Sequence, residues 1–173
     1  MWLWVGLGNP GKKYENTRHN IGAIMLRHVA PEYISYSIDK SMNGELAKMK
    51  TDEDHLLLIP LTFMNLSGDA VVKTMKYHKI KPDKMVVFHD ELELEPLDVR
   101  YKFGGGHKGH NGLRDIIQKI GSPDFHRLRI GIGRPPNRDY SVADYVLSRM
   151  PKDDIPDRQS VMDILLDNKL PVL

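Results

Sequence analysis

His19 and Asp90 have the side chains that general base catalysis by an activated water requires. A neutral imidazole accepts a proton from water near neutral pH, and a carboxylate on its other ring nitrogen fixes the tautomer and stabilises the imidazolium. Such a base contributes about 10²- to 10⁴-fold to a rate. Because the two residues are far apart in the sequence, only the fold can bring them together. The alternative is that His19 is an ordinary loop histidine and that Asp90 caps a helix or a turn.

Asn9, Asn65 and Asn111 each stand in a polar loop that is expected to follow a strand. An amide both donates and accepts hydrogen bonds, so it suits a peptide-like ligand, and it can donate to an oxyanion without changing its protonation state. A single asparagine beside glycine usually serves a turn. Because an asparagine recurs at three such loops, ligand binding and turn formation remain two equal alternatives for these residues.

Aromatic and basic residues accompany these amides. Tyr14 and Phe63 could stack on a base or a ribose, although packing in the core would also explain Phe63. Lys102 and Arg129 could contact phosphates, and such contacts would position a nucleic acid without reading its sequence.

Basic residues are concentrated between Asp98 and Arg138, where nine lysines and arginines face three acids. This segment is therefore +6 in a chain with a formal net charge of +2, and the remainder is −4. A local basic surface indicates a polyanionic partner such as nucleic acid, although a solvated face would show the same charges. If the segment neutralises phosphates, affinity should fall as salt rises.

Gly6, Gly8 and Gly11 match the dinucleotide-binding pattern G-x-G-x-x-G. That pattern binds a pyrophosphate only if a helix begins inside it and an acidic residue closes the second strand about 20 residues later. Pro10 and the polar run from Lys12 to Arg18 predict a loop instead. We therefore expect no nucleotide cofactor.

His107 and His110 lie in a glycine-rich run, with His89 available as a third imidazole. A His-x-x-His pair in such a run is not the helical pair of ligands that zinc sites use, and no cysteine is present. We therefore expect no metal. The run from Gly104 to Gly109 is interpreted as a backbone that passes close to a large ligand.

The candidate residues must be positioned by strands that alternate with helices. Apolar patterns predict strands at Trp2 to Val5, Ser35 to Ile38, Gly44 to Lys50, Leu56 to Leu61, Lys84 to Phe88, Val99 to Phe103 and Arg127 to Ile132. They predict helices at Ile21 to Val29, after Gly68, at Leu113 to Ile120, Val142 to Leu147 and Val161 to Leu166. The order predicts an α/β fold, a three-layer domain with a mixed, mostly parallel sheet flanked by helices. Four strand ends would then deliver the candidate residues to one rim.

Length and composition agree with one globular domain over residues 1–173. The chain is 40% hydrophobic and 28% charged, and its longest apolar run, Leu56 to Leu61, is too short to span a bilayer. No secretory signal is visible at the N-terminus. The absence of cysteine excludes disulfides and thiolate chemistry and is compatible with the cytoplasm.

Several motifs, in order over nearly the whole chain, closely resemble those of the bacterial-type peptidyl-tRNA hydrolases. They are V-G-L-G-N-P-G (5–11) with Tyr14 and T-R-H-N (17–20), F-M-N-L-S-G (63–68), H-D-E-L (89–92), G-G-G-H-K-G-H-N-G-L (104–113) and F-H-R-L-R-I-G-I-G-R-P (125–135). The chain departs from the usual pattern at Lys108, where another glycine is commoner, and at Leu97-Asp98, where a Pro-Gly turn is commoner.

The resemblance implies a monomeric, metal-independent cytoplasmic esterase that cleaves the ester between a peptide and the 3′ ribose of tRNA. It would recycle tRNA from aborted translation, without an obligate protein partner and without a membrane. His19 would be the general base and Asp90 its support. Asn9 would help to distinguish N-blocked from free aminoacyl-tRNA. The remaining substrate contacts would come from Tyr14, Phe63, Asn65 and Asn111 toward the peptide and the tRNA 3′ end, and from Lys102 and Arg129 toward the tRNA backbone.

Two other classes remain as alternatives. One is an RNA-binding relative that kept the surface and lost turnover, against which the presence of His19, Asp90 and Asn65 argues. The other is an oxidoreductase that binds a nicotinamide or another nucleotide.

The sequence has no serine in a G-x-S-x-G elbow, which disfavours the usual nucleophilic route of α/β-hydrolases.

Overall fold

The structure, a computed structural model, describes all residues from Met1 to Leu173 and is built on one seven-stranded sheet. The strands, in the order β2-β3-β4-β1-β5-β7-β6, are β1 (Trp2–Gly6), β2 (Ser37–Asp39), β3 (Gly44–Lys50), β4 (Asp54–Pro60), β5 (Met85–Glu91), β6 (Val99–Phe103) and β7 (His126–Gly131). The helices are α1 (Ile21–Val29), α2 (Ser67–His78), α3 (Asn111–Ile120), α4 (Val142–Val146) and α5 (Arg158–Asp167). Short 3₁₀ turns occupy Arg18–Asn20, Met64–Leu66, Pro82–Lys84 and Lys152–Asp154.

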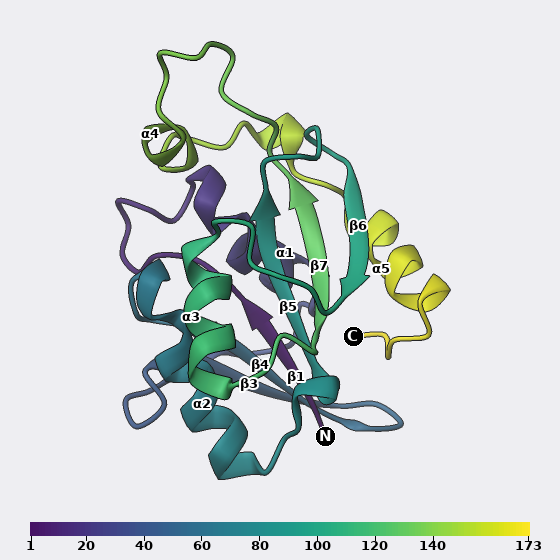
Figure 1. Cartoon of the computed structure of the whole chain (residues 1–173). Coiled ribbons are helices and arrows are strands. Elements are labelled where there is room, and N and C mark those ends of the chain that lie inside the picture. The colour runs from purple at the N-terminus through teal and green to yellow at the C-terminus, as the bar shows by residue number, and fades with distance from the viewer.

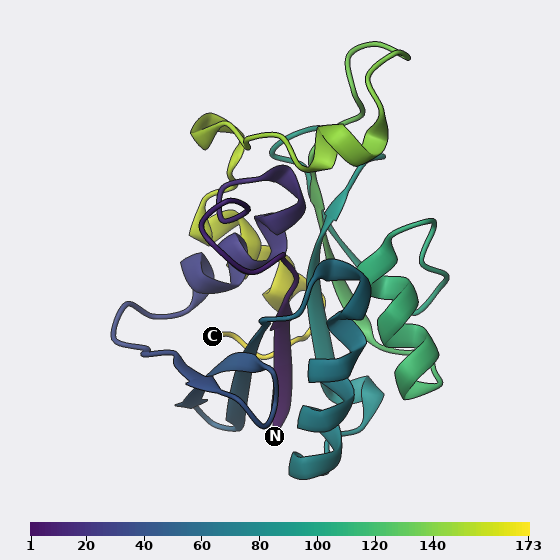
Figure 2. The ribbon, with the colours of Figure 1, turned by 90° about the vertical axis from the view of Figure 1, so that its left-hand side faces the viewer.

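The four central strands, β4, β1, β5 and β7, run parallel to one another, whereas β3, β2 and β6 are antiparallel to their neighbours. Helices α1 and α5 cover one face of the sheet, and α2 and α3 cover the other (Figures 1 and 2). The predicted α/β fold, with a mixed sheet between helices, is confirmed. None of the helices is both long and apolar enough to cross a membrane.

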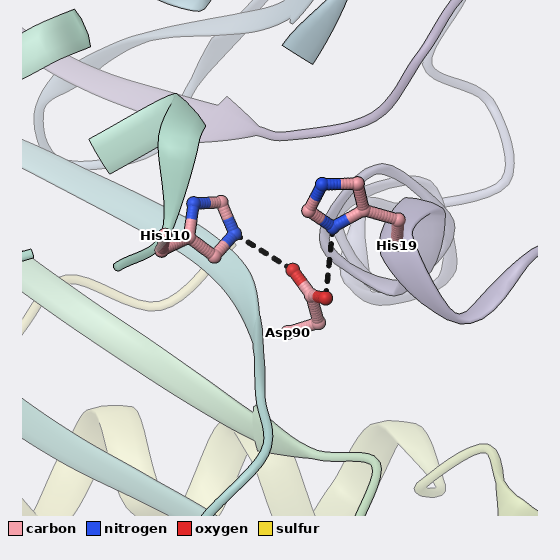
Figure 3. Close-up of side chains that lie close together, drawn as sticks. All are labelled: His19, Asp90 and His110. Carbon is pink, nitrogen blue, oxygen red and sulfur yellow. Dashed lines mark hydrogen bonds and ion pairs between the residues drawn. The ribbon is translucent and has the colours of Figure 1, made fainter. Parts of the chain in front are cut away.

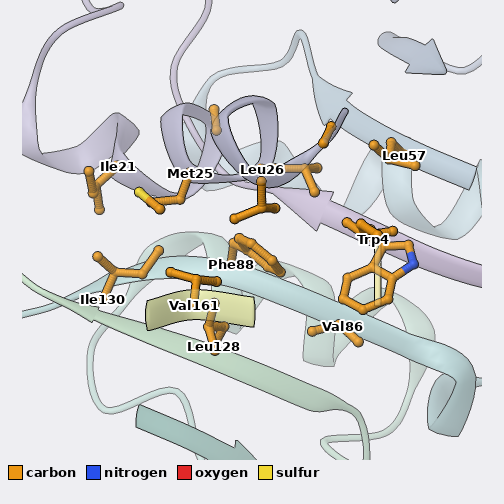
Figure 4. Packing of buried hydrophobic residues seen from close by; sticks show 14 of the residues in the cluster. Trp4, Ile21, Met25, Leu26, Leu57, Val86, Phe88, Leu128, Ile130 and Val161 are labelled. Carbon is orange, nitrogen blue, oxygen red and sulfur yellow. The ribbon is translucent and has the colours of Figure 1, made fainter. Parts of the chain in front are cut away.

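The apolar strands divide their side chains between two cores. Along β1, Trp4 joins a cluster of 26 buried residues beneath α1 and α5, whereas Leu3 and Val5 join a cluster of 15 beneath α2 and α3. Phe88 of β5 lies next to Trp4 at the centre of the larger cluster (Figure 4). Because successive side chains of a strand point to opposite faces, a central strand that is covered on both faces must be continuously apolar.

One feature of the predicted sheet is wrong. From Arg127 to Ile132, basic and apolar residues alternate, with Leu128, Ile130 and Ile132 expected to point inward, which predicts a half-exposed strand; yet Arg127 is only 2% exposed. The glycine-rich segment between β6 and α3 lies over this part of the sheet and covers the guanidinium.

Candidate active site

Asp90 lies at the carboxyl end of β5 and is bound by two imidazoles. Its residue exposure is 5%, so the carboxylate is almost completely removed from water. His19 Nδ1 lies 2.8 Å from Oδ2, and His110 Nε2 lies 2.7 Å from Oδ1 (Figure 3). The fold thus brings together His19, which follows β1, and Asp90, and it adds an imidazole that precedes α3.

Close packing of α1 on β5 places His19 beside Asp90. His19 lies in the 3₁₀ turn that leads into α1, and Gly22 follows in the first turn of the helix. A β-carbon at Gly22 would lie 2.1 Å from the carbonyl oxygen of Phe88, so only glycine permits this approach. The backbone N–H of Leu7 also donates to that carbonyl, at 3.1 Å.

Arg18 ties the turn that carries His19 to the segment after α4. Its guanidinium donates to Ser148 Oγ and to the carbonyl of Arg149, and it lies 4.4 Å from the ring centre of Tyr145. The backbone N–H of Arg18 donates to the carbonyl of Ser148 as well. The position of His19 is therefore coupled to the α4 region.

The hydrogen bonds of His110 determine its tautomer. His110 is the N-cap residue of α3, and its Nδ1 accepts from the backbone N–H groups of Gly112 and Leu113 at 3.1 and 3.2 Å. A ring nitrogen that accepts carries no hydrogen, so the ring proton is on Nε2 and is donated to Asp90 Oδ1. One oxygen of Asp90 is thereby satisfied, and the other is left to accept from His19.

Since Asp90 accepts from His19 Nδ1, the Nε2 atom of His19 is the nitrogen left to take a proton. Figure 3 shows this second nitrogen pointing away from Asp90. Burial lowers the pKa of His19, but attraction to Asp90 and their hydrogen bond outweigh it, so the pKa is raised above 6.5. Burial acts to raise the pKa of Asp90, yet the two histidines hold it well below its usual range. The pair therefore has the electrostatics of a supported general base.

His19 and Asp90 line a pocket of about 400 Å³ with a strongly basic wall. The wall combines residues of β5, β6 and β7 with the glycine-rich segment and α4, and its cations are Lys102, Lys108, Arg127, Arg129 and Arg134. The His89 imidazole, 4% exposed, belongs to the same wall. Desolvation by burial, followed by the neighbouring His110, lowers the pKa of His89 to about 3, so this imidazole is neutral at physiological pH.

The predicted site residues fall into two groups. Five of them line the basic pocket: His19, Asp90, Lys102, Asn111 and Arg129. The other four, Asn9, Tyr14, Phe63 and Asn65, belong to the loops after β1 and β4 and do not line it.

Asn111 reaches the pocket by a different route from the expected one. The prediction places it at the end of a strand, but β6 is antiparallel to β7 and ends at the opposite edge of the sheet (Figure 1). The segment from Gly104 to His110 then returns along the sheet to the start of α3. Positive φ angles at Gly104, Gly105 and Gly109, of 67°, 94° and 81°, shape this return, and Lys108 adopts φ 45° in the same run.

Asn9 is held in one orientation by two partners. Its backbone N–H donates to Asn20 Oδ1 at 2.8 Å, and its carbonyl accepts from Asn20 Nδ2 at 2.9 Å. Its own Oδ1 accepts from the backbone N–H of Met64 at 2.7 Å. The side chain of Asn9 is therefore left with its two Nδ2 hydrogens as free donors.

Tyr14 and Phe63 pack edge to face near Asn9, with ring centroids 6.4 Å apart. Phe63 is 56% exposed, so the alternative that it packs in the core is wrong. Asn65 is also exposed and follows Met64, whose N–H binds Asn9. These side chains form a surface that adjoins the Asn9 amide.

Two residues with evident roles in this geometry are absent from the predicted site. The sequence suggests His110 only as a zinc ligand, because its spacing from His107 is visible in the sequence and its contact with Asp90 is not. The sequence gives only a weak indication of a role for Asn20, which is that it follows His19 directly. Its two hydrogen bonds, with the backbone N–H and the carbonyl of Asn9, require the loop to fold back.

His19, Asp90 and His110 are also the one group whose donor atoms lie close enough together, within 4.8 Å, to hold a metal ion. The hydrogen bonds disfavour that use. His110 Nε2 carries a proton because Nδ1 caps α3, and a protonated ring nitrogen cannot be a ligand. The cluster fits a hydrogen-bonded catalytic group better than a metal centre.

Comparisons with known proteins agree with this site. A family model described as peptidyl-tRNA hydrolase matches residues 3–169. The peptidyl-tRNA hydrolase of Rickettsia bellii (strain RML369-C) is 44% identical over 170 residues, covering 97% of this chain and 91% of the relative. That of Pseudomonas putida (strain GB-1) is 46% identical over 174 residues, covering 99% and 87%.

Among solved structures, the crystal structure of peptidyl-tRNA hydrolase from Acinetobacter baumannii superposes with a TM-score of 0.82 at 43% identity. The match covers 96% of this chain and 83% of that chain. Agreement in sequence over almost the whole length, in fold and in chemistry suited to ester hydrolysis leads to one conclusion: this chain belongs to the peptidyl-tRNA hydrolase family.

Proposed function

We propose that this chain hydrolyses the ester between the peptide and the 3′ ribose of peptidyl-tRNA, using a water molecule that His19 activates. The observation that carries the proposal is the His19–Asp90 pair at the edge of a basic pocket. Hydrolysis would return tRNA from aborted translation to use. We expect the protein to act as a monomer in the cytoplasm.

His19 Nε2 accepts a proton from the attacking water as its oxygen bonds to the ester carbonyl carbon. The imidazolium that forms is stabilised by Asp90, whose ionised carboxylate accepts from Nδ1. When the tetrahedral intermediate collapses, the same proton passes from Nε2 to the 3′ oxygen of the ribose as the ester bond breaks. The cycle ends with His19 neutral again.

Asn111 is suited to stabilise the oxyanion of that intermediate. It lines the pocket with His19, and its Oδ1 accepts from the Arg114 guanidinium at 3.3 Å. The amide therefore presents its Nδ2 hydrogens as free donors. A donor that is already oriented can stabilise developing negative charge without reorganising.

Lys102 and Arg129 are suited to bind tRNA phosphates. Arg129 Nε donates to Glu91 Oε1 at 3.0 Å, and Nη2 lies 2.9 Å from the same oxygen in an ion pair, which fixes the guanidinium while other N–H groups remain free. Burial, followed by repulsion from Lys108 and Arg127, lowers the pKa of Lys102. The crowding of cations creates a positive potential that a phosphate would relieve.

The free donors of Asn9 explain a preference for N-blocked substrates. An N-acylated residue carries a carbonyl oxygen that can accept from Asn9 Nδ2. A free aminoacyl group has an ammonium in its place, which cannot accept and which faces a donor. Tyr14, Phe63 and Asn65 extend this surface and would contact the peptide and the 3′ end of the tRNA.

Replacing Asn9 with aspartate is expected to reduce the preference for blocked over free aminoacyl-tRNA by about fivefold, since one net hydrogen bond contributes about 1 kcal/mol. The second carboxylate oxygen would repel the acyl carbonyl and attract a free ammonium. The measurement is kcat/KM for N-acetyl-aminoacyl-tRNA and for aminoacyl-tRNA. Asn43→Asp, in the connection between β2 and β3, is the control, and an unchanged preference in N9D would refute this role.

The proposed function itself is tested with the native chain by release of N-acetyl-aminoacyl groups from tRNA, with and without EDTA. We expect rapid cleavage of the blocked substrate, slow cleavage of the free aminoacyl substrate, and no effect of EDTA, because water activation needs only His19 and Asp90. Binding of tRNA without cleavage would support a non-catalytic RNA-binding protein instead. Loss of cleavage in EDTA would assign the cluster around Asp90 to a metal.

A further inference from the structure

Arg127 is the one arginine of the basic pocket that is almost fully buried and forms no ion pair, although the charge of Asp124 still attracts it. Arg129 and Arg134, in the same wall, form ion pairs with Glu91 and Glu93. Arg127 forms none, and its side chain is almost completely shielded from solvent. Desolvation lowers the pKa of its guanidinium, as expected for a cation held away from water. A tRNA phosphate would have difficulty reaching it.

The guanidinium of Arg127 instead binds backbone carbonyls. Nη1 donates to Gly106 at 2.7 Å, and Nη2 donates to Gly105 and, at 3.1 Å, to Pro123. The group also lies 4.5 Å from the ring centre of Phe125. Gly105 and Gly106 precede α3, and Pro123 follows it, so one side chain fastens the chain on both sides of the helix.

These bonds hold a segment that has few other anchors. Between β6 and α3 the backbone takes left-handed φ values at four positions, Gly104, Gly105, Lys108 and Gly109, and forms no regular structure. Its far end carries His110, whose Nε2 must reach Asp90 at 2.7 Å, and then Asn111. A shift of the segment would therefore move both residues relative to His19.

We propose that Arg127 is a positioning residue, which fastens the glycine-rich segment so that His110 and Asn111 meet Asp90 and the reacting ester. This inference rests on the proposed function and deepens it. It also removes Arg127 from the set of tRNA-binding cations, although its charge and position in the sequence resemble those of Arg129. The two roles can be distinguished experimentally. If Arg127 bound a tRNA phosphate, its substitution would change KM, whereas if it holds the backbone of the glycine-rich segment, the same substitution changes kcat.

Lysine keeps the positive charge but cannot reproduce a planar group that donates to three carbonyls. For Arg127→Lys we therefore expect kcat to fall by about 10²-fold, the effect of a displacement of about 1 Å in an active site. We expect KM for N-acetyl-aminoacyl-tRNA, and its dependence on salt, to remain close to those of the native chain. A tRNA-binding cation would show the opposite division, with an increase in KM and a smaller salt dependence.

Arg158→Lys is the matched control. Arg158 also donates to backbone carbonyls, of Val29 and Leu173, but from α5 and on the opposite face of the sheet from α3. It should lose thermal stability without losing kcat. Arg127→Met is a second variant that removes the buried charge while keeping much of the side-chain volume, and its kcat should fall as in R127K.

All variants are assayed at a temperature at which circular dichroism shows each of them to be folded. If wild-type cleavage is absent or survives His19→Ala, the proposed function fails. If cleavage depends on His19 but R127K and R127M retain native kcat, only this inference fails. A change confined to KM and salt dependence would assign Arg127 to the tRNA backbone. Failure of both variants to fold would show that Arg127 serves the fold itself and would also overturn the inference.

Discussion

Replacing His19 with alanine is expected to lower kcat for N-acetyl-aminoacyl-tRNA by about 10²- to 10⁴-fold, the usual contribution of a general base. Of the two imidazoles that bind the Asp90 carboxylate, only His19 has a ring nitrogen left to accept a proton, and the variant lacks it. His110 cannot substitute for it, because its Nδ1 caps α3 and its Nε2 donates to Asp90. KM should change much less, because the basic wall of the pocket is retained.

His28→Ala is the control for this experiment. His28 lies in α1, the helix that follows His19, but its side chain is exposed to solvent and has no part in the pocket. The assay compares single-turnover release of the acetylated amino acid by the two variants and the native chain. Equal rates for H19A and H28A would remove His19 from the reaction.

Replacing Asp90 with asparagine is expected to lower kcat by about 10⁴-fold, as the equivalent change does in serine proteases. Asp90 accepts from both imidazoles, whereas an amide offers one acceptor and one donor. The helix cap fixes the His110 proton on Nε2, so the amide oxygen must turn toward His110. Its NH₂ group then faces His19 Nδ1 and selects the tautomer with the proton on Nε2, which cannot accept from water.

The same variant tests the electrostatics. In the native chain only unprotonated His19 is active, and because Asp90 raises its pKa, the acid limb of kcat should lie above pH 6.5. D90N removes the attraction and leaves the burial, which lowers the pKa, so the remaining activity should have its acid limb at lower pH. An acid limb of kcat at the same pH in D90N and in the native chain would show that Asp90 does not set the His19 pKa.

A double variant separates the tautomer argument from simple loss of charge. In D90N/H110A the amide is free to rotate and to accept from His19 Nδ1, which restores the active tautomer. We expect this double variant to be less impaired than the product of the two single effects, a coupling that a double-mutant cycle measures directly. Strict additivity would mean that His110 does not dictate the orientation of the group at position 90.

Local sequence determined most of the secondary structure. The predicted helix at Ile21 to Val29 and the strands at Gly44 to Lys50 and Val99 to Phe103 have the bounds seen in the structure. Their side-chain periodicity reflects which face is buried, and that information is contained in a few neighbouring residues. Motifs spread over the chain also identified the family, because several short patterns in a fixed order seldom coincide by chance.

Tertiary structure alone decided how the site is assembled. The direction of β6, and hence the route by which Asn111 arrives, depends on its pairing with β7, which no local pattern encodes. The burial of Arg127 depends on a segment that crosses over it. The sequence thus determined which elements form and which side chains are available for chemistry. Hydrogen bonds between distant segments decided which nitrogen of His19 and which atoms of Asn9 are free to act, because a donor or acceptor is free only where the fold supplies no partner for it.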